Sequence, residues 1–353
     1  MSKRASVVAG LAVLLLVSAA LAGVRAWRDR PVDLRDAMAL APGDAARYTW
    51  TDWAGVREKL GVHVGADSTP AQVSAFLDKG YDADLTPMSS LTDSAGLLQK
   101  YYGWSPATLD WEMFSESTTG AVMIGRLPDS TSYDRLRDRL RRSGFTPPAD
   151  GSDVWDGSTV EFGSTGGEAD EVTPVISYVA LVPDRHLVLT SDASDYLQSA
   201  VDHLDDDALP TGVSQVVDAA GEPLAAAVYS GDYTCSELAM TNAGADDQAT
   251  ASQLLAQAGK VNPVDGFAMA TQPGGDVRVA MSFENHEQAV TNADTRARLA
   301  AGPAPGQGGD FGDRFRLGKV AADGDVVTMA LHPVEDADVL SDLSTGPLLF
   351  ATC

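Results

Sequence analysis

Residues 48–53 read YTWTDW, and residues 227–233 read AVYSGDY. Each stretch is an extended segment with aromatic side chains that leads directly into a segment of helical pattern. Each also carries an aspartate, Asp52 in the first and Asp232 in the second, where a carboxylate would cap the helix that follows. The match predicts that the chain contains two copies of one structural unit.

The similarity continues along both halves of the chain. A strand pattern followed by a helical pattern occurs at residues 120–142 and again at 277–299. A hairpin pattern that leads into a short helix follows each of them, at residues 175–204 and 315–343. An Asp-Gly turn and alternating apolar residues are typical of such hairpins. We therefore expect an α+β fold of two duplicated modules, each an antiparallel sheet with helices packed on one face. An alternative remains open, because any α+β chain offers enough strands and helices for a chance alignment.

The repeat also predicts the domain organisation. Residues 31–210 would form the first module, and residues 211–353 would form the second. The first module has an insert at about residues 68–115, where Ser68 and Pro70 begin a helix and apolar residues recur at helical spacing.

The first 30 residues differ from the rest of the chain. An apolar run from Ala5 to Val24 is long enough to span a bilayer as an uncleaved N-terminal transmembrane helix. A cleaved signal peptide is the alternative, with small-residue sites at residues 20–22 and 24–26. Residues 1–30 hold five of the 25 basic residues and one of the 50 acidic residues, so the remaining body is strongly acidic. We expect this segment to hold that body at the membrane, outside the cytoplasm.

The composition and the motifs argue against several classes of protein. A formal net charge of −25 argues against nucleic-acid binding, because so few cations cannot form an extended basic face. No G-x-S-x-G, H-E-x-x-H or phosphate-binding glycine motif occurs in the sequence. No two of the five histidines stand three or four residues apart, and the aspartates of residues 202–207 lack the spacing of a calcium loop. We therefore predict no catalytic motif, no metal site and no cofactor.

The two cysteines bear on the side of the membrane that the body faces. Two cysteines in one extracytoplasmic domain usually form a disulfide. We expect Cys235 to pair with Cys353, which would tie the end of the chain to the start of the second module. Closing so long a loop stabilises a fold by roughly 4–5 kcal/mol in the chain-entropy model. Two free thiols are the alternative, and they would suit a body that faces the cytoplasm.

A group of aromatic residues near the end of the insert is the candidate ligand or partner face. Tyr101, Tyr102 and Trp104 are almost consecutive, and Trp111 follows. Neighbours on one regular helix cannot all face the same core. Rigid aromatic side chains also supply much of the contact area in binding sites. The alternative is that these four residues fill the core of the insert.

The organisation of the whole chain carries a resemblance. An N-terminal apolar segment without a lipid-attachment cysteine, before a body rich in Ala, Asp, Val and Gly, resembles uncharacterised membrane-anchored or exported envelope proteins of high-GC actinobacteria. The resemblance brings no functional motif and no site. From the tether, the duplicated modules and the absence of a catalytic motif, we expect a cell-membrane protein whose partner is an unknown envelope protein or ligand. The leading hypothesis is a non-enzymatic, membrane-tethered binding module. The alternative is a secreted hydrolase whose active site assembles from distant segments, with Asp52 or Asp232 beside a remote histidine.

Overall fold

The computed structural model describes residues 33–163, 172–204 and 209–353. Residues Leu34–Cys353 group together as one compact unit. The expected N-terminal transmembrane or signal helix, at residues 1–30, lies outside the described residues. Within the described ranges, no helix combines the length and the apolar character that a bilayer crossing requires.

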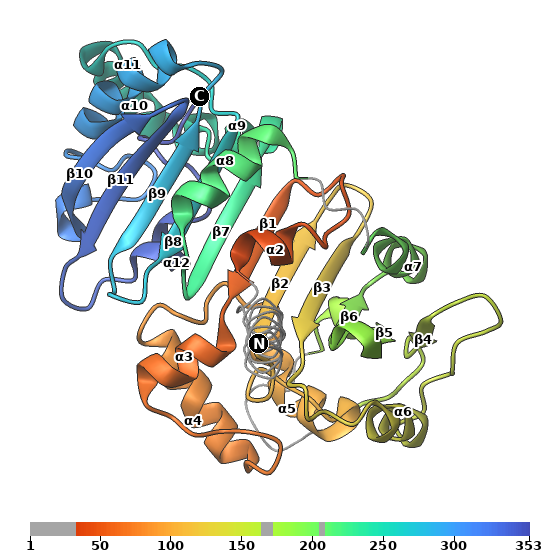
Figure 1. Cartoon of the computed structure of the whole chain (residues 1–353). Helices are drawn as coiled ribbons and strands as arrows, with labels where there is room; N and C mark the ends of the chain where they lie inside the picture. The colour runs from red at the N-terminus through yellow and green to blue at the C-terminus, as the bar shows by residue number, and fades with distance from the viewer. Residues whose placement is uncertain (1–32, 164–171, 205–208) are drawn as a thin grey trace, which may run out of the picture. The chain divides into compact units, whose positions relative to one another are not determined.

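One antiparallel sheet of eleven strands runs through the described part of this unit (Figure 1). Its strand order is β10-β11-β9-β8-β7-β1-β2-β3-β6-β5-β4, and neighbouring strands are antiparallel throughout. The strands are β1 (Arg47–Thr51), β2 (Trp111–Glu116), β3 (Ala121–Arg126), β4 (Val154–Asp156), β5 (Tyr178–Val182), β6 (Leu187–Ser191), β7 (Ala225–Ser230), β8 (Gly266–Thr271), β9 (Val277–Ser282), β10 (Phe315–Asp323) and β11 (Val326–Pro333). The expected α+β class with antiparallel pairing is confirmed.

The sheet is continuous because the first strands of the two halves pair with each other. β1 and β7 are antiparallel neighbours, with Thr49 opposite Ala227. Beside this pair, Trp50 Nε1 donates a hydrogen bond to the Pro223 carbonyl at 3.0 Å. The two aromatic stretches that suggested a repeat therefore lie side by side within one sheet.

Most helices occur where the sequence predicts them. They are α2 (Leu34–Met38), α3 (Trp53–Leu60), α4 (Pro70–Tyr81), α5 (Ala95–Leu97), α6 (Tyr133–Arg142), α7 (Ser194–His203), α8 (Thr211–Ala220), α9 (Gly231–Glu237), α10 (Ala245–Ala258), α11 (His286–Leu299) and α12 (Val339–Leu343). The helical expectation for the insert is wrong over β2. There Trp111, Met113 and Ser115 alternate on one face of the sheet, while the buried Glu112 on the other face accepts a hydrogen bond from Trp53 Nε1 at 3.0 Å.

Helices cover both faces of the sheet in the second half, so the expectation of helices on one face is wrong there. Helix α8 lies across β7, β8 and β9 (Figure 1). The side chains that these strands turn toward it are small, and they include Ala226, Ala268 and Ala280. Ser282 Oγ donates to the carbonyl of Gly212 in the first turn of α8 at 3.1 Å. Small side chains on this face let the helix approach the strands closely.

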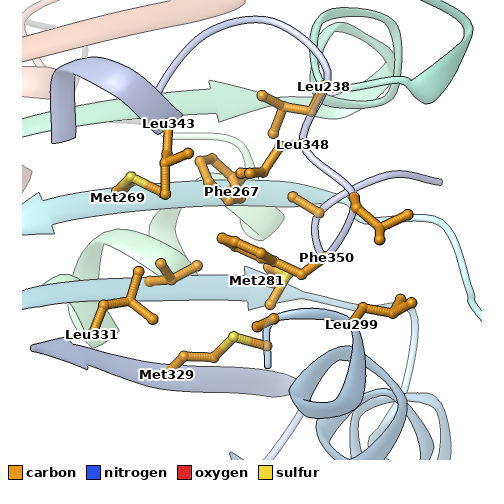
Figure 2. Packing of buried hydrophobic residues seen from close by; sticks show 14 of the residues in the cluster. Leu238, Phe267, Met269, Met281, Leu299, Met329, Leu331, Leu343, Leu348 and Phe350 are labelled. Carbon is orange, nitrogen blue, oxygen red and sulfur yellow. The ribbon is translucent and has the colours of Figure 1, made fainter. Parts of the chain in front are cut away.

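The opposite face of the same strands carries larger side chains. Phe267, Met269 and Met281 enter a core that α9, α11, α12 and the C-terminal segment complete (Figure 2). From that segment, Leu348 and Phe350 reach into the middle of the core and are fully buried. Burial of this apolar surface is the main force that holds the end of the chain against the sheet.

Candidate functional site

The aromatic residues expected to form a ligand face lie mainly in the interior. The exposed fractions are 0% for Tyr102, 1% for Trp104 and 5% for Trp111. The π-helical turn η2 (Leu98–Tyr102) ends at Gly103, which has φ +89°, and Trp104 then packs edge-on against Tyr102 with ring centres 5.9 Å apart. The expectation of an exposed face is wrong for these three residues. The chain leaves the helix between Tyr102 and Trp104, so both can enter the same core, whereas Trp111 lies in β2 and packs against Trp50 with ring centres 5.5 Å apart. Tyr101 is half-buried.

The two cysteines form the expected pair. Cys235 in α9 and the terminal Cys353 are bonded, with their Cα atoms 5.4 Å apart and 118 positions between them in the sequence. The bond fastens α9 to the C-terminal segment that fills the core of the second half.

The two aspartates named in the hydrolase hypothesis, Asp52 and Asp232, lie at different positions relative to the helices that follow them. The carboxylate of Asp52 accepts a hydrogen bond from Gly55 N at 2.9 Å and caps α3, as expected. Burial raises the pKa of Asp52. Asp232 does not cap a helix, because α9 begins one residue earlier, at Gly231, and Asp232 lies within its first turn. The expectation of a second cap is therefore wrong.

A polar hollow in the first half gathers positive charge. It measures about 580 Å³ and lies between α3, α6 and the loops at residues 64–67 and 103–108. We call it the arginine hollow, because the described residues that line it include Arg57, Arg135, Arg139 and Arg142 but only one carboxylate, that of Asp67. This balance reverses that of the whole chain, which has 25 basic and 50 acidic residues. A second hollow of about 740 Å³ adjoins it and shares Arg57 and residues 64–67.

The arginines of α6 divide between two faces of the helix. On the face away from the hollow, each arginine pairs with the aspartate three residues before it. Arg137 lies 2.9 Å from Asp134, and Arg141 lies 3.0 Å from Asp138. These exposed pairs neutralise their own charge within the helix.

The arginines on the other face of α6 have no such carboxylate partner. Arg135 and Arg142 are exposed along the hollow and make no hydrogen bond or ion pair within the described ranges. Arg139 donates through Nη1 to the Lys100 carbonyl at 2.7 Å, which leaves its other nitrogens available. Its side chain passes over Gly103, where an added Cβ would come within 3.2 Å of the Arg139 Cδ.

Hydrogen bonds hold the other walls of the hollow in place. Arg57 Nη1 donates to the Leu109 carbonyl at 2.8 Å, and burial lowers the pKa of the Arg57 guanidinium. Gln99 Nε2 donates to the Ser68 carbonyl at 2.7 Å and so ties the loop after α3 to η2. Three hydroxyl groups just before α6 also line the hollow, those of Ser130, Thr131 and Ser132. The Ser132 side chain makes no capping hydrogen bond, so its hydroxyl is not committed to the helix.

Sequence reasoning missed this site, although part of the signal is readable. In the segment YDRLRDRLRR, Arg137 and Arg141 follow an aspartate at a spacing of three. At the same spacing, the residues before Arg135, Arg139 and Arg142 are Ser, Leu and Arg, so none of these three arginines has an aspartate three residues before it. The sequence alone does not identify the unpaired face, because Arg142 also stands four residues after Asp138 and Arg135 stands three residues before it. Nor does the sequence show that a loop some 70 residues earlier in the chain approaches α6.

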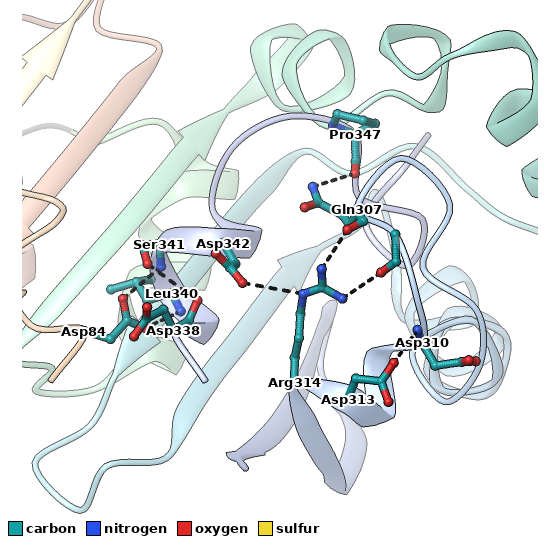
Figure 3. A network of polar contacts seen from close by, with 11 residues as sticks. Asp84, Gln307, Asp310, Asp313, Arg314, Asp338, Leu340, Ser341, Asp342 and Pro347 are labelled. Carbon is teal, nitrogen blue, oxygen red and sulfur yellow. Dashed lines mark hydrogen bonds and ion pairs between the residues drawn. The ribbon is translucent and has the colours of Figure 1, made fainter. Parts of the chain in front are cut away.

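A second polar arrangement joins the two halves (Figure 3). Asp84 has a left-handed backbone, with φ +55°, and its carboxylate accepts from the Leu340 and Ser341 amides at 2.6 and 3.1 Å. These amides belong to the first turn of α12, where the helix itself offers no partner. Burial raises the pKa of Asp84 to about 6. Asp84 therefore binds the insert of the first half to the last helix of the second.

Metal ligands do not assemble in the part of the chain that the structure describes, where no three histidine, cysteine or carboxylate side chains gather suitably.

Comparison with known proteins gives distant likenesses alone. No protein-family model matches the sequence. No curated protein matches it either. Among solved structures, the chain is similar to crystal forms I, III and IV of TP0453, with 10%, 11% and 11% identity and TM-scores of 0.39, 0.38 and 0.40. The matches cover 89%, 87% and 86% of this chain and 98%, 96% and 94% of those chains.

Proposed function

We propose that this protein is a membrane-tethered, extracytoplasmic binding module, and that the arginine hollow is its ligand site. The observation that carries the proposal is the row of arginines on α6 that line a hollow without carboxylate partners, in a chain of net charge −25. Clustered cations in a concave site create a local positive potential that attracts anions. The ligand is therefore an anion, taken from the cell envelope and bound without chemical change.

The tether and the location rest on other features. The apolar run from Ala5 to Val24, with its basic flanks, supports anchoring at the cell membrane. The Cys235–Cys353 pair supports an oxidising compartment, because structural disulfides are rare in the cytosol.

We also propose that the two halves are duplicated modules. Counted outward from the centre of the sheet, one half has the order β1, β2, β3, β6, β5 and the other has β7, β8, β9, β11, β10. In each half, helices follow the first of these strands, β1 or β7, along the chain. A further helix comes later, α6 between β3 and β5 in one half and α11 between β9 and β10 in the other. The arginine row of α6 has no equivalent in α11, whose sequence is HEQAVTNADTRARL. On this proposal, the first module acquired the ligand site after duplication.

Thiol labelling tests the location. Intact cells that express the full chain are treated with a membrane-impermeant reductant and then with a membrane-impermeant maleimide. We expect Cys235 and Cys353 to be labelled in intact cells to the same extent as in lysed cells. Labelling that requires lysis would place the body in the cytoplasm and overturn this part of the proposal.

Ligand binding tests the site. The full chain in detergent is titrated with citrate, inorganic phosphate and pyrophosphate as anionic probes, with glucose as the neutral control. We expect saturable binding of at least one anion, weakened by Arg135→Gln. Binding of no anion, or binding that this substitution leaves unchanged, would exclude the arginine hollow as the ligand site.

A further inference from the structure

We propose that the arginine hollow recognises a phosphoryl group, so that its natural ligand is a phosphate ester. This inference rests on the proposed function, which makes the hollow an anion site, and it names the chemical class of that anion. It is drawn from the number, type and arrangement of the hydrogen-bond donors in the lining.

The first argument is charge. Among the described residues, Arg135 and Arg142 have no hydrogen-bond or ion-pair partner, and Arg139 has free nitrogens beyond the one bonded to Lys100. Against them stands the single carboxylate of Asp67. A monocarboxylate ligand brings one negative charge, which one bidentate arginine can match. A phosphate monoester brings close to two, which suits the larger number of cations here.

The second argument is the arrangement of the donors. The lining brings the α6 arginines together with Arg57 of α3, whose Nη1 is bonded to backbone carbonyls. Ser130, Thr131 and Ser132, which directly precede the first turn of α6, also line the hollow. The amides of this turn add positive partial charge close to the hydroxyls. Donors that approach from several directions suit a tetrahedral group with three terminal oxygens better than a planar carboxylate.

The third argument is size. A hollow of about 580 Å³ exceeds what inorganic phosphate fills and lies within the range of small-molecule sites. The apolar side chains of Val64, Leu127 and Leu136 also line it. The ligand thus carries an organic part beside its phosphoryl group, as a soluble phosphate ester or a phospholipid headgroup does.

The experiment uses two pairs of substitutions on one helix. The double variant Arg135→Gln, Arg142→Gln removes the uncommitted cations beside the hollow. The double variant Arg137→Gln, Arg141→Gln removes the same charge from the ion-paired face. Binding of inorganic phosphate, pyrophosphate and citrate to the full chain in detergent is measured by calorimetry. All four positions are at the surface of α6, so circular dichroism should report folded protein throughout.

We expect phosphate and pyrophosphate to bind more tightly than citrate, although citrate carries more negative charge than phosphate, because the donors suit a tetrahedral group better than planar carboxylates. We also expect the first double variant to lose about tenfold or more in affinity and the second about twofold or less, because charge-assisted contacts are lost only in the first. Equal losses in the two variants would show unspecific attraction and overturn the inference. Citrate binding without phosphate binding would overturn the phosphoryl assignment and leave the proposed function intact. Binding of none of the three anions would overturn both.

A second comparison separates the two sources of a phosphate ester. Glycerol 3-phosphate is compared with short-chain phosphatidic acid in the same detergent, with short-chain diacylglycerol as the phosphate-free control. Tighter binding of glycerol 3-phosphate supports a soluble ester, and tighter binding of phosphatidic acid supports a lipid headgroup. Diacylglycerol binding as tight as either would show that the phosphoryl group is not recognised and would contradict the inference.

Discussion

At the scale of single residues, the protonation of Asp84 makes the free energy of unfolding depend on pH. Its pKa in the folded protein is about 6, against 3.8 for an ordinary aspartate, and burial is the main cause. The Leu340 and Ser341 hydrogen bonds oppose the shift, and the nearby Asp338 adds to it. Because the folded state binds this proton more tightly than the unfolded state, its stabilising effect is complete below pH 3.8 and is lost as the pH rises through 6.

Asp84→Asn tests this account. Asparagine keeps an oxygen acceptor for α12 and tolerates the left-handed backbone, but it cannot ionise. Between pH 4 and pH 7.5, we expect the unfolding free energy of the variant, relative to the wild type, to increase by up to about 3 kcal/mol. Urea denaturation at the two pH values measures this difference. The exposed neighbour Asp82 is the control, since Asp82→Asn should show a much smaller change. Equal changes in both variants would refute the assignment to Asp84.

Arg296 is the other buried charge whose contacts permit a sharp prediction. It is fully buried in α11 and donates to three backbone carbonyls, those of Asn262, Phe350 and Thr352, at 2.7, 2.8 and 3.0 Å. Arg296→Met would leave these buried acceptors without partners, so we expect a loss of at least about 3 kcal/mol in unfolding free energy. Arg298→Met on the same helix removes one partly buried bond, to Ala258, and should cost about 1 kcal/mol. Similar midpoints for the two variants in urea would disprove the role given to Arg296.

At the scale of elements, a close backbone approach between α8 and the sheet depends on two glycines, Gly212 and Gly266. A Cβ at Gly266, the first residue of β8, would lie 2.6 Å from the Gly212 carbonyl oxygen in α8. Backbone atoms must move to accommodate it, so we expect Gly266→Ala to destabilise the protein by about 1–3 kcal/mol. Gly274→Ala, in the turn after β8, meets nothing within 4 Å and should change stability by less than about 0.5 kcal/mol. Thermal denaturation of both variants checks the contrast, and an unaffected Gly266→Ala variant would rule out the tight contact.

Helix α6 and strand β8 show which kinds of element could be predicted from the sequence and which could not. Helix α6 was predictable because Tyr133, Leu136 and Leu140 recur at helical spacing and form its buried stripe. Strand β8 was not, because GFAMAT is buried along its whole length. Its small residues face α8 and its large ones face the other core, so no apolar–polar alternation marks it as a strand. For the candidate site, the sequence shows that α6 is rich in arginine, but it shows neither which of these arginines are unpaired nor which loop faces them.

At the scale of the whole molecule, the sheet is continuous across the two halves, so we expect the halves to unfold together. β1 pairs with β7, Asp84 caps α12, and Met88 of the first half lies in the apolar core of the second. Each of these contacts would be lost if one half unfolded alone. The exposed edge of β1 or β7 would add to that cost, because its amides and carbonyls would lose their partners. The two halves should therefore form one cooperative unit.

The distribution of tryptophan makes this cooperativity measurable. Five of the six tryptophans lie between residues 50 and 155, in the first half, and the sixth is Trp27 in the N-terminal segment. Tryptophan fluorescence therefore reports mainly on the first half, whereas far-UV circular dichroism reports on both halves. For the full chain in detergent and urea, we expect the two signals to give coincident transitions. Asp84→Ala removes the cap of α12, and it should move both transitions to lower urea by the same amount. Separate midpoints in the wild type, or a shift of one signal alone in the variant, would mean that the halves are stable independently and that the β1–β7 junction is only a weak link.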